Sequence, residues 1–455
     1  MKRVLLPSIG ILILGLTTLR ADDWPMFGGR PDRNPVSSEK GLPGIFGKEN
    51  VRWVVALGDQ TNGTPSVGGG RVFIGTNNGA PRDPKVVGDR GVLMCFSAAD
   101  GKFLWQTVHE KLPGKEAEDW PSAGIASTPC VAGEQVYYVS NRGELVCCSV
   151  QDGKILWLLD MKKDLGAQPY EASASSPLVV GDLVFVNTGN APDGKTHKVK
   201  NPAAPSFLAV NRQTGKVVWQ DSSPGDKIVH GQWGSAAYGV VEGQPQVAFS
   251  GGDGWVYSFE PATGKLIWKF NCKAHEKAAA PGAEPTEVNL PATPVFSGHR
   301  VLVAVGVDVD TTGEGCLRAI DARQKGDVTK SAELWRFEGK EFGLTISNVA
   351  VHEALVYAVE LDGRVDCIDL ETGKRLWRHD LLAQSWSTPL VVDGKVYVRT
   401  GDTEIVVFQA ARTLKVLGVN NQGNPFKLSH GSVIAAGGVL YFAGQTQLFA
   451  VAAGK

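Results

Sequence analysis

A Gly-Lys-x-x-Trp turn recurs along the chain, short hairpins alternate with it, and the composition is rich in glycine and tryptophan. These three features predict an all-β fold, an eight-bladed β-propeller of four-stranded antiparallel blades. The chain has 455 residues, with 55 Gly and 12 Trp but only 4 Met, which favours frequent turns over long helices. The repeats indicate one ring-shaped domain instead of several separate ones.

The turn motif reads Asp or Thr, then Gly-Lys, two further residues and Trp. Its five clear copies end at Trp105, Trp157, Trp219, Trp268 and Trp377. Looser turns at Trp53 and Trp335 extend the series, and Val416 stands where we expect an eighth Trp. A large ring at one site of nearly every blade predicts packing between neighbouring blades.

Upstream of each turn, a Ser or Thr introduces two short strands joined by a tight turn. The hairpins begin near Thr64, Thr128, Ser176, Ser235, Thr293, Ser347, Thr388 and Ser432. The last unit stops near Val451 without a Trp strand, whereas residues 51–57 form a lone Trp strand. We therefore expect the N-terminal strand to complete the last blade and close the ring.

The N-terminus resembles an export signal. Lys2 and Arg3 precede an apolar run at 4–19, which is shorter than the roughly 20 residues that span a bilayer. The expected divisions are a signal peptide at 1–21, an N-terminal arm at 22–50 and the propeller at 51–455. We expect a periplasmic or secreted protein without a membrane span and, because no cysteine lies at the cleavage site, without a lipid anchor.

Charge and cysteine content restrict the partners. The 46 basic and 47 acidic side chains give a net charge of −1, which argues against nucleic-acid binding. An oxidising compartment favours disulfides, but seven cysteines are an odd number and cannot all pair within the chain. Cys147 and Cys148 fall at ordinary packing positions of a strand and point to opposite faces, which favours buried thiols over a disulfide between them. We expect a monomer that binds a protein or a small ligand.

Loop lengths distinguish the two faces of the predicted ring. With blade strands lettered A to D from the channel outward, the A–B turns and most C–D turns are short, whereas the long insertions fall in B–C and D–A connections. These insertions are 77–91, 106–124, 190–206, 270–291 and 307–315. Binding residues arise preferentially on such loops, so we assign binding to this loop-bearing face. Candidates at the channel mouth are Trp120, Tyr170, Glu171, His230, Trp233, Trp386 and His430, which alternatively only fill the channel.

The blade motifs and the opening Trp24-Pro25-Met26-Phe27-Gly28-Gly29 segment resemble the pyrroloquinoline-quinone (PQQ) repeat superfamily across essentially the whole mature chain. That superfamily contains quinoprotein alcohol dehydrogenases and also non-catalytic propellers similar to the assembly lipoprotein BamB. The resemblance implies the fold more strongly than it implies either function.

Residue by residue, the resemblance to the dehydrogenases is incomplete. Asn190, in Thr188-Gly189-Asn190, matches the segment that supplies an asparagine calcium ligand in those enzymes. Gly234 stands at their catalytic aspartate, and Gly252 at the arginine that faces the quinone; the tryptophan below the cofactor is replaced near 173–175. A glycine cannot act as a general base. In a divergent site, the cofactor-binding candidates are Asn190, Trp233, Asp253 and Glu171.

Metal candidates are Asn190 and the loop that contains Asp308 and Asp310, whose alternating oxygens suit calcium but also suit an acidic surface turn. We expect no catalytic residues and no bound cofactor. The favoured hypothesis is an exported, non-catalytic propeller similar to BamB that binds a ligand or protein on its loop-bearing face. The alternative is a divergent PQQ- and calcium-dependent dehydrogenase acting on an alcohol or sugar.

Overall fold

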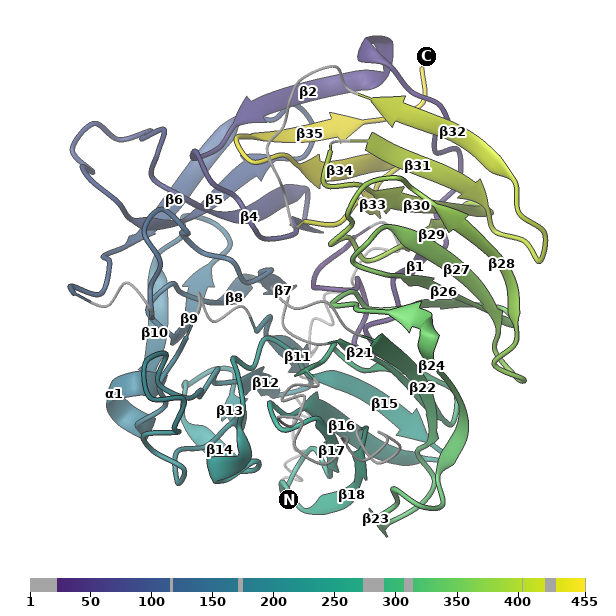
Figure 1. Ribbon diagram of the computed structural model, residues 1–455. Helices are drawn as coiled ribbons and strands as arrows, with labels where there is room; N and C mark the ends of the chain where they lie inside the picture. Colours follow the sequence, from purple (N-terminus) through teal and green to yellow (C-terminus); the bar gives the residue numbers. More distant parts are fainter. Residues whose placement is uncertain are drawn as a thin grey trace, which may run out of the picture.

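The computed structural model describes residues 23–114, 118–170, 175–272, 290–306, 314–402, 404–421 and 431–454. Within these residues, the strands form eight antiparallel sheets arranged as a ring around a central axis (Figure 1). The predicted eight-bladed β-propeller is therefore confirmed. Successive strands of a blade run from the centre of the ring to its rim.

The first four blades follow the chain in order. Blade 1 consists of β3 (Ser66–Gly68), β4 (Arg71–Asn77), β5 (Gly91–Ser97) and β6 (Phe103–His109). Blade 2 consists of β7 (Cys130–Ala132), β8 (Gln135–Val139), β9 (Glu144–Ser149) and β10 (Ile155–Asp160). Blade 3 consists of β11 (Leu178–Val180), β12 (Leu183–Asn187), β13 (Phe207–Asn211) and β14 (Val217–Asp221). Blade 4 consists of β15 (Ala237–Val241), β16 (Gln244–Ser250), β17 (Trp255–Phe259) and β18 (Leu266–Asn271).

The remaining blades complete the ring. Blade 5 consists of β20 (Val295–Ser297), β21 (Arg300–Gly306), β22 (Glu314–Asp321) and β24 (Glu333–Gly343), with β19 (Leu290–Pro291) beside β21. Blade 6 consists of β25 (Ala350–His352), β26 (Leu355–Val359), β27 (Arg364–Asp369) and β28 (Arg375–Asp380). Blade 7 consists of β29 (Leu390–Val392), β30 (Lys395–Arg399), β31 (Glu404–Gln409) and β32 (Val416–Asn421). Blade 8 consists of β33 (Ile434–Ala436), β34 (Val439–Ala443), β35 (Gln447–Val451) and β2 (Val51–Ala56).

Blade 8 joins the two ends of the propeller. β2 pairs antiparallel with β35, so that Trp53 lies opposite Ala450 and Val54 opposite Phe449. The N-terminal strand thus supplies the outermost strand of the last blade, which confirms the predicted closure. Figure 1 shows this purple strand beside the yellow C-terminal strands.

The repeated tryptophans fasten each blade to the next. Six indole N–H groups donate to a carbonyl in the C–D turn of the following blade, and all of these rings except that of Trp377 lie on the glycine of that turn. The bonds are Trp53 to Ala98 (3.1 Å), Trp105 to Val150 (2.9 Å), Trp157 to Arg212 (2.9 Å), Trp219 to Pro261 (2.8 Å), Trp335 to Leu370 (2.7 Å) and Trp377 to Ala411 (3.0 Å). A Cβ at Gly153 would lie 2.4 Å from the Trp105 ring, and its φ is +73°, so the motif requires glycine for two reasons.

Two contacts between blades depart from this pattern. Trp268 faces the inserted turn of blade 5 and donates instead to Gln246 Oε1 at 2.8 Å, while β23 (Gly326–Asp327) pairs in parallel with β18. Between blades 7 and 8, the strand register places Gly418, opposite Val407, at the tryptophan position. The expectation that Val416 takes this place is wrong by two residues. Blade 8 has no C–D turn because its outer strand comes from the N-terminus.

The Ser and Thr residues that begin the hairpins join blades at the inner rim. At six contacts between blades, the hydroxyl of one blade accepts a backbone N–H from the preceding blade. The bonds are Thr128 N to Ser176, Ser176 N to Ser235, Ser235 N to Thr293, Asn348 N to Thr388, Thr388 N to Ser432 and Ser432 N to Thr64, at 2.8–3.3 Å. These side chains therefore satisfy amides that no strand pairs.

The segment Asp23–Asn50, which we call the N-terminal arm, follows the innermost strands around the channel. The carbonyls of Pro25, Pro31, Asp32 and Pro35 accept the N–H groups of Val131, Tyr238, Phe296 and Val391 at 2.7–3.0 Å. Trp24 pairs with blade 1, Asn34 bonds both backbone groups of Val351 in blade 6, and Glu39 accepts the amides of Gly437 and Gly438 in blade 8. At blades 7 and 8 the arm reaches the A–B turns, through Gly41 to Asp393 and Glu39 to Gly437 and Gly438.

Arg33 fixes the arm to blades 3 and 4. Its side chain is fully buried, and its guanidinium donates to the carbonyls of Ala236 (2.6 Å), Phe27 (2.7 Å), Ser176 (3.0 Å) and Pro177 (3.2 Å). Burial lowers the pKa of Arg33 to about 10, which leaves it charged at neutral pH. Carbonyl dipoles therefore stabilise the positive charge of Arg33, and the neighbouring Asp32 also favours it.

Replacing Arg33 should destabilise the whole ring. Arg33→Ala leaves buried carbonyls without a donor, so we expect the free energy of unfolding to fall by about 2–4 kcal/mol. Urea denaturation measures this change, and Lys40→Ala, which alters an exposed residue of the same arm, is the matched control. Equal stability of the two variants would show that Arg33 does not hold the arm.

Candidate functional site

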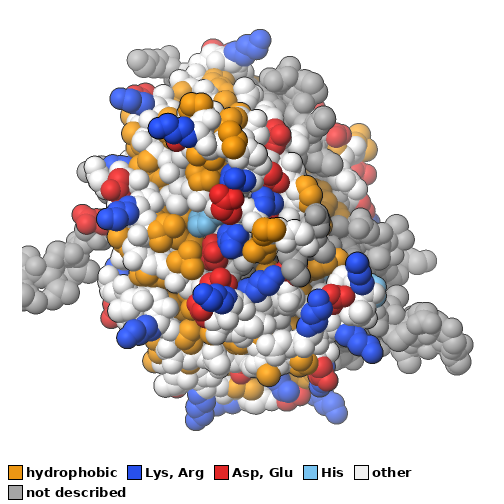
Figure 2. Space-filling view, turned by 90° about the vertical axis from the view of Figure 1, so that its left-hand side faces the viewer, with side chains coloured by type: hydrophobic (Ala, Val, Ile, Leu, Met, Phe, Trp, Pro, Cys, Tyr) orange, Lys and Arg blue, Asp and Glu red, His pale blue; other side chains and the backbone are white. Residues whose placement is uncertain are grey.

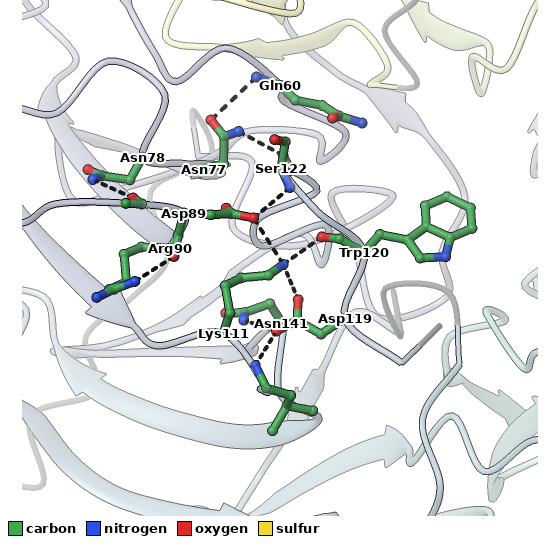
Figure 3. Close-up of polar contacts among 12 residues, drawn as sticks. Gln60, Asn77, Asn78, Asp89, Arg90, Lys111, Asp119, Trp120, Ser122 and Asn141 are labelled. Atoms are coloured by element: carbon green, nitrogen blue, oxygen red, sulfur yellow. Dashed lines mark hydrogen bonds and ion pairs between the residues drawn. The ribbon is translucent and has the colours of Figure 1, made fainter. Parts of the chain in front are cut away.

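A polar cluster organises the loop-bearing face over blades 1 and 2 (Figure 3). We call Asp89, Lys111, Asp119 and Asn141 the Lys111 network. The Lys111 ammonium contacts Asp119, donates to the Trp120 carbonyl at 2.6 Å and lies 3.9 Å from Asp89 Oδ2. The Asp119 side chain, 1% exposed, also accepts from Asn141 Nδ2 at 2.8 Å and from the Leu112 amide at 2.9 Å. A single buried carboxylate therefore joins the long D–A loop of blade 1 to the B–C turn of blade 2.

Asn77 extends this connection to the loop that enters blade 1. Its Oδ1 accepts the amides of Asp59 (2.9 Å) and Gly79 (3.1 Å), and its Nδ2 donates to Ser122 O at 2.7 Å. The Ser122 amide in turn donates to Asp89 Oδ2 at 2.7 Å. Three loops distant in sequence are thus held in one arrangement before any ligand binds.

Trp120 is the aromatic side chain that this arrangement presents. Its carbonyl is fixed by Lys111, whereas its indole is 43% exposed and points away from the network (Figure 3). Next to it, Glu118 forms an ion pair with Lys162 on α1 (Met161–Leu165), which follows blade 2. The loop therefore crosses blade 2 and displays one large apolar ring from a rigid support.

Tyr138, His109 and Glu144 form a chain of polar contacts where blades 1 and 2 meet, which we call the buried relay. His109 Nε2 lies 2.8 Å from Tyr138 Oη and its Nδ1 lies 3.3 Å from Glu144 Oε2. Burial raises the pKa of Glu144, but hydrogen bonds from His109, Ser140 and Arg142 outweigh it and lower this pKa to about 2. His109 and Glu144 are nearly inaccessible, so the relay supports the loops and does not face a substrate.

Three predicted channel-mouth residues come together over blades 3 and 4. The rings of Tyr170 and His230 lie 5.6 Å apart in an edge-on arrangement, and those of His230 and Trp233 lie 5.2 Å apart. Trp233 folds back over its own loop, since a Cβ on Gly231 would lie 2.6 Å from its ring. Trp386 is half-buried in the connection between β28 and β29.

Asn190 and Gly252 are bridged by a protein side chain. Asn190 is fully buried, and its Oδ1 accepts the Gln168 amide at 3.0 Å. Gln232 donates to Asn190 O at 2.7 Å and accepts the Gly252 amide at 3.0 Å. A Cβ on Gly252 would lie 2.8 Å from Ile228 Cγ2 and 2.9 Å from Gln232 Cγ. No side chain fits at position 252 unless this loop moves.

Asp253 is also used within blade 4. Its carboxylate, 7% exposed as a residue, accepts the Tyr257 hydroxyl at 2.7 Å and the Trp255 amide at 3.2 Å. Burial, together with the nearby Asp253, raises the pKa of Tyr257 well above its usual range. The other candidates Glu171, His430, Asp308 and Asp310 lie outside the described residues.

These contacts bear on whether the face fits calcium and a quinone. The oxygen that Asn190 would offer to calcium already holds a backbone amide, and Gly252 has no room for a cationic side chain. Among the described residues, no three His, Cys, Asp or Glu side chains gather as metal ligands. The described part of this face does not fit the cofactor of the resembling dehydrogenases.

The cysteines match the packing interpretation. All seven lie within the described residues as buried free thiols, and burial raises the pKa of Cys147 to about 12. Cys147 pairs with Tyr137 and Cys148 with Val136 on the adjacent strand. They are packing residues of blade 2.

Sequence reasoning missed the Lys111 network. The lengths of 77–91 and 106–124 predict two of the loops that hold it, but Asn141 lies in the short B–C turn of blade 2. Neither loop shows a motif that specifies Lys111 as the shared cation. The contact between Asp119 and Asn141 depends on two blades lying side by side.

The pKa of Glu144 predicts an acid-dependent stability. Because its folded pKa of about 2 lies below the ordinary value of 4.5, its contribution is present above pH 4.5 and is lost as pH falls toward 2. Glu144→Gln should therefore be less stable than the natural chain at pH 7, and the difference should shrink near pH 3. Urea denaturation at both pH values, with exposed Glu134→Gln as the control, measures this; a constant difference would contradict the assignment.

No helix among the described residues is long and apolar enough to cross a membrane. Among solved structures, BamB from Moraxella catarrhalis is similar with a TM-score of 0.55 and 14% identity, covering 88% of this chain and 96% of that one. A europium-containing methanol dehydrogenase is similar with a TM-score of 0.51 and 15% identity, covering 95% of this chain and 89% of that one. At these identities the likeness concerns the fold alone.

Curated relatives show the same two groups. BamB of Yersinia pestis is 24% identical over 322 residues, 69% of this chain and 68% of its own length. A polyvinylalcohol dehydrogenase of a Pseudomonas species is 22% identical over 376 residues, 68% of this chain and 56% of its own length. The match thus spans little more than half of that dehydrogenase. The family model described as outer membrane protein assembly factor BamB matches residues 48–251, 89–326 and 313–454, and the chain therefore belongs to this family of PQQ-repeat propellers.

Proposed function

We propose that this chain is a non-catalytic binding propeller, whose loop-bearing face over blades 1 to 4 engages a protein partner outside the cytoplasm. The observation that carries the proposal is the bridge that Gln232 makes between Asn190 and Gly252. These are two of the positions that the resemblance assigns to the calcium and quinone of the dehydrogenases.

The bridge raises the free-energy cost of binding a cofactor at this place. Asn190 Oδ1 already accepts the Gln168 amide, so calcium would have to share this buried oxygen with a backbone N–H. The Gln232 side chain is 3% exposed and would also have to move. Blades 3 and 4 therefore use these residues to hold their loops together.

The opposite end of the channel supports the same proposal. The arm contacts the A–B turns of blades 7 and 8, whereas the long loops lie on the other side of the ring. There, the Lys111 network fixes Trp120 in an exposed position, and such preorganised aromatic side chains are typical anchors of protein interfaces. The predicted signal peptide at 1–21 and the outer-membrane assembly role named for the BamB relative favour a location beyond the inner membrane.

A titration tests the non-catalytic part of the proposal. PQQ added to the mature protein in a calorimeter should give no saturable heat, with or without calcium, because Gln232 bridges Asn190 and Gly252 and position 252 has no room for a side chain that faces a quinone. Calcium-dependent binding near one quinone per chain, lost in Asn190→Ala, would instead support the dehydrogenase.

A second experiment tests the binding face. A photo-reactive amino acid at Trp120 should give a discrete covalent adduct in intact cells, because this side chain is exposed on the proposed face. The same amino acid at Lys216, which is exposed next to a C–D turn on the opposite side, is the matched control. No adduct from position 120, or equal adducts from both positions, would contradict the proposed surface.

A further inference from the structure

Two carboxylates are buried where blade 5 meets blade 6. On the rim that faces the viewer in Figure 2, Lys, Arg, Asp and Glu side chains lie at the surface among hydrophobic patches. Glu360 and Asp366, by contrast, are both 0% exposed. Glu360 follows β26 directly, in the B–C turn of blade 6, and Asp366 lies in β27. Because a buried charge is costly unless it is paired, the groups around these carboxylates determine whether both are ionised.

One guanidinium joins the two carboxylates. Arg378 on β28 donates through Nε to Asp366 Oδ1 at 2.8 Å and through Nη2 to Asp366 Oδ2 at 2.7 Å. The same Nη2 contacts Glu360 Oε1 and donates to the Glu341 carbonyl at 2.7 Å. A guanidinium nitrogen of this kind carries two hydrogens, but here it faces three acceptors. Arg378 therefore cannot satisfy all three fully at the same time.

Two further arginines lie beside this group. Arg364 pairs with Glu360 Oε2 at 3.0 Å and also contacts Asp362. Arg375 Nε lies 2.9 Å from Asp366 Oδ1. Among the described side chains, three cations thus surround three carboxylates. The added contacts fall on Glu360 Oε2 and Asp366 Oδ1, so the two remaining oxygens still share the one guanidinium nitrogen.

Glu360 is the carboxylate on which a proton fits. The Gly343 amide at the end of β24 donates to its Oε2 at 2.7 Å, which leaves Oε1 as the oxygen that can be protonated. Burial and the charge of Asp366 raise the pKa of Glu360 above its ordinary value of 4.5, although Arg378 and Arg364 oppose this shift. A proton on Oε1 finds its acceptor in Asp366 Oδ2, because both oxygens contact the same nitrogen.

We propose that Glu360 and Asp366 form a proton-sharing pair that makes the contact between blades 5 and 6 sensitive to pH. At neutral and basic pH, Arg378 lies between Glu360 Oε1 and Asp366 Oδ2. At acidic pH, one proton takes that place, and Arg378 keeps only Asp366 Oδ1 and the Glu341 carbonyl. The step moves a proton and breaks no covalent bond.

The pair lies beneath the loop-bearing face. The B–C turn that begins with Glu360 joins two D–A connections, because the Leu361 amide donates to Leu344 O at 2.7 Å and the Leu361 carbonyl accepts the Ser385 amide at 3.1 Å. Loss of the contact between Arg378 and Glu360 frees this turn from β28. Acidic pH should therefore loosen the loops over blades 5 and 6. This inference does not depend on which partner the face binds.

The pH dependence of stability distinguishes this pair from an ordinary ion pair. Because the pKa of Glu360 is raised in the folded chain, its ionisation costs stability as pH rises above 4.5 through the folded pKa. In urea denaturation at about pH 5 and about pH 8, the midpoint of Glu360→Gln should rise relative to the natural chain as pH rises. An ordinary ion pair predicts the opposite sign. Glu371→Gln removes an exposed pair with Arg300 in the same region and should differ from the natural chain equally at both pH values.

Hydrogen–deuterium exchange tests the contact in the natural chain, without any substitution in the network. After correction for intrinsic exchange, protection of the Gly343 and Leu361 amides should fall by about tenfold from about pH 8 to about pH 5, while β12 stays equally protected. Protection of both amides that does not change with pH would overturn the proposal. So would a Glu360→Gln midpoint that stays level with, or falls below, that of the natural chain as pH rises.

Discussion

Backbone hydrogen bonds between the N-terminal arm and the innermost strands hold the centre of this propeller. The innermost strand of each blade pairs with the second strand on one side. On its other side, toward the channel, its own blade supplies no hydrogen-bond partner for the backbone. The arm supplies carbonyls to blades 2, 4, 5 and 7, side-chain groups to blades 3, 6 and 8, and a strand-like pair to blade 1. One segment therefore contacts every blade, and the fully buried Arg33 anchors it through hydrogen bonds to carbonyls. The Trp–Gly contacts and the hydroxyl bonds fasten adjacent blades only, whereas the arm joins them all.

This construction separates the two faces of the molecule. The arm binds the inner strands and reaches the A–B turns of blades 7 and 8, and the other side carries the long loops. Those loops are themselves tied by buried polar groups: Asp119 joins blades 1 and 2, and Gln232 joins the loops of blades 3 and 4. Because these bonds already order the loops, a partner can bind the face without the entropy cost of ordering them first. The Gln232 bridge joins two of the positions that the resemblance to the dehydrogenases assigns to calcium and the quinone.

The sequence predicted the fold in detail because the repeat is enforced by packing. At five C–D turns a glycine with positive φ packs against the tryptophan of the preceding blade, so the spacing of these pairs counts the blades. The eighth position could not be assigned correctly, because Gly418 makes room for the arm: a Cβ there would lie 2.7 Å from Gly44 O and Ile45 Cγ1. The site was predictable in part. Tyr170, His230 and Trp233 do gather, since their loops precede neighbouring inner strands. The roles of Arg33, Lys111 and Gln232 depend on contacts between segments distant in sequence, and the repeat pattern does not predict these contacts.

The arm's contact with every blade makes the account testable in a single experiment. Hydrogen–deuterium exchange, read by mass spectrometry, reports the amides of Val131, Tyr238, Phe296 and Val391, which bond the arm in four different blades. The account predicts that peptides containing these amides exchange as slowly as the buried strands β8 and β12, and that Arg33→Ala accelerates them in all four blades together. Rapid exchange at these amides in the natural chain, while the second strands of the same blades stay protected, would contradict it.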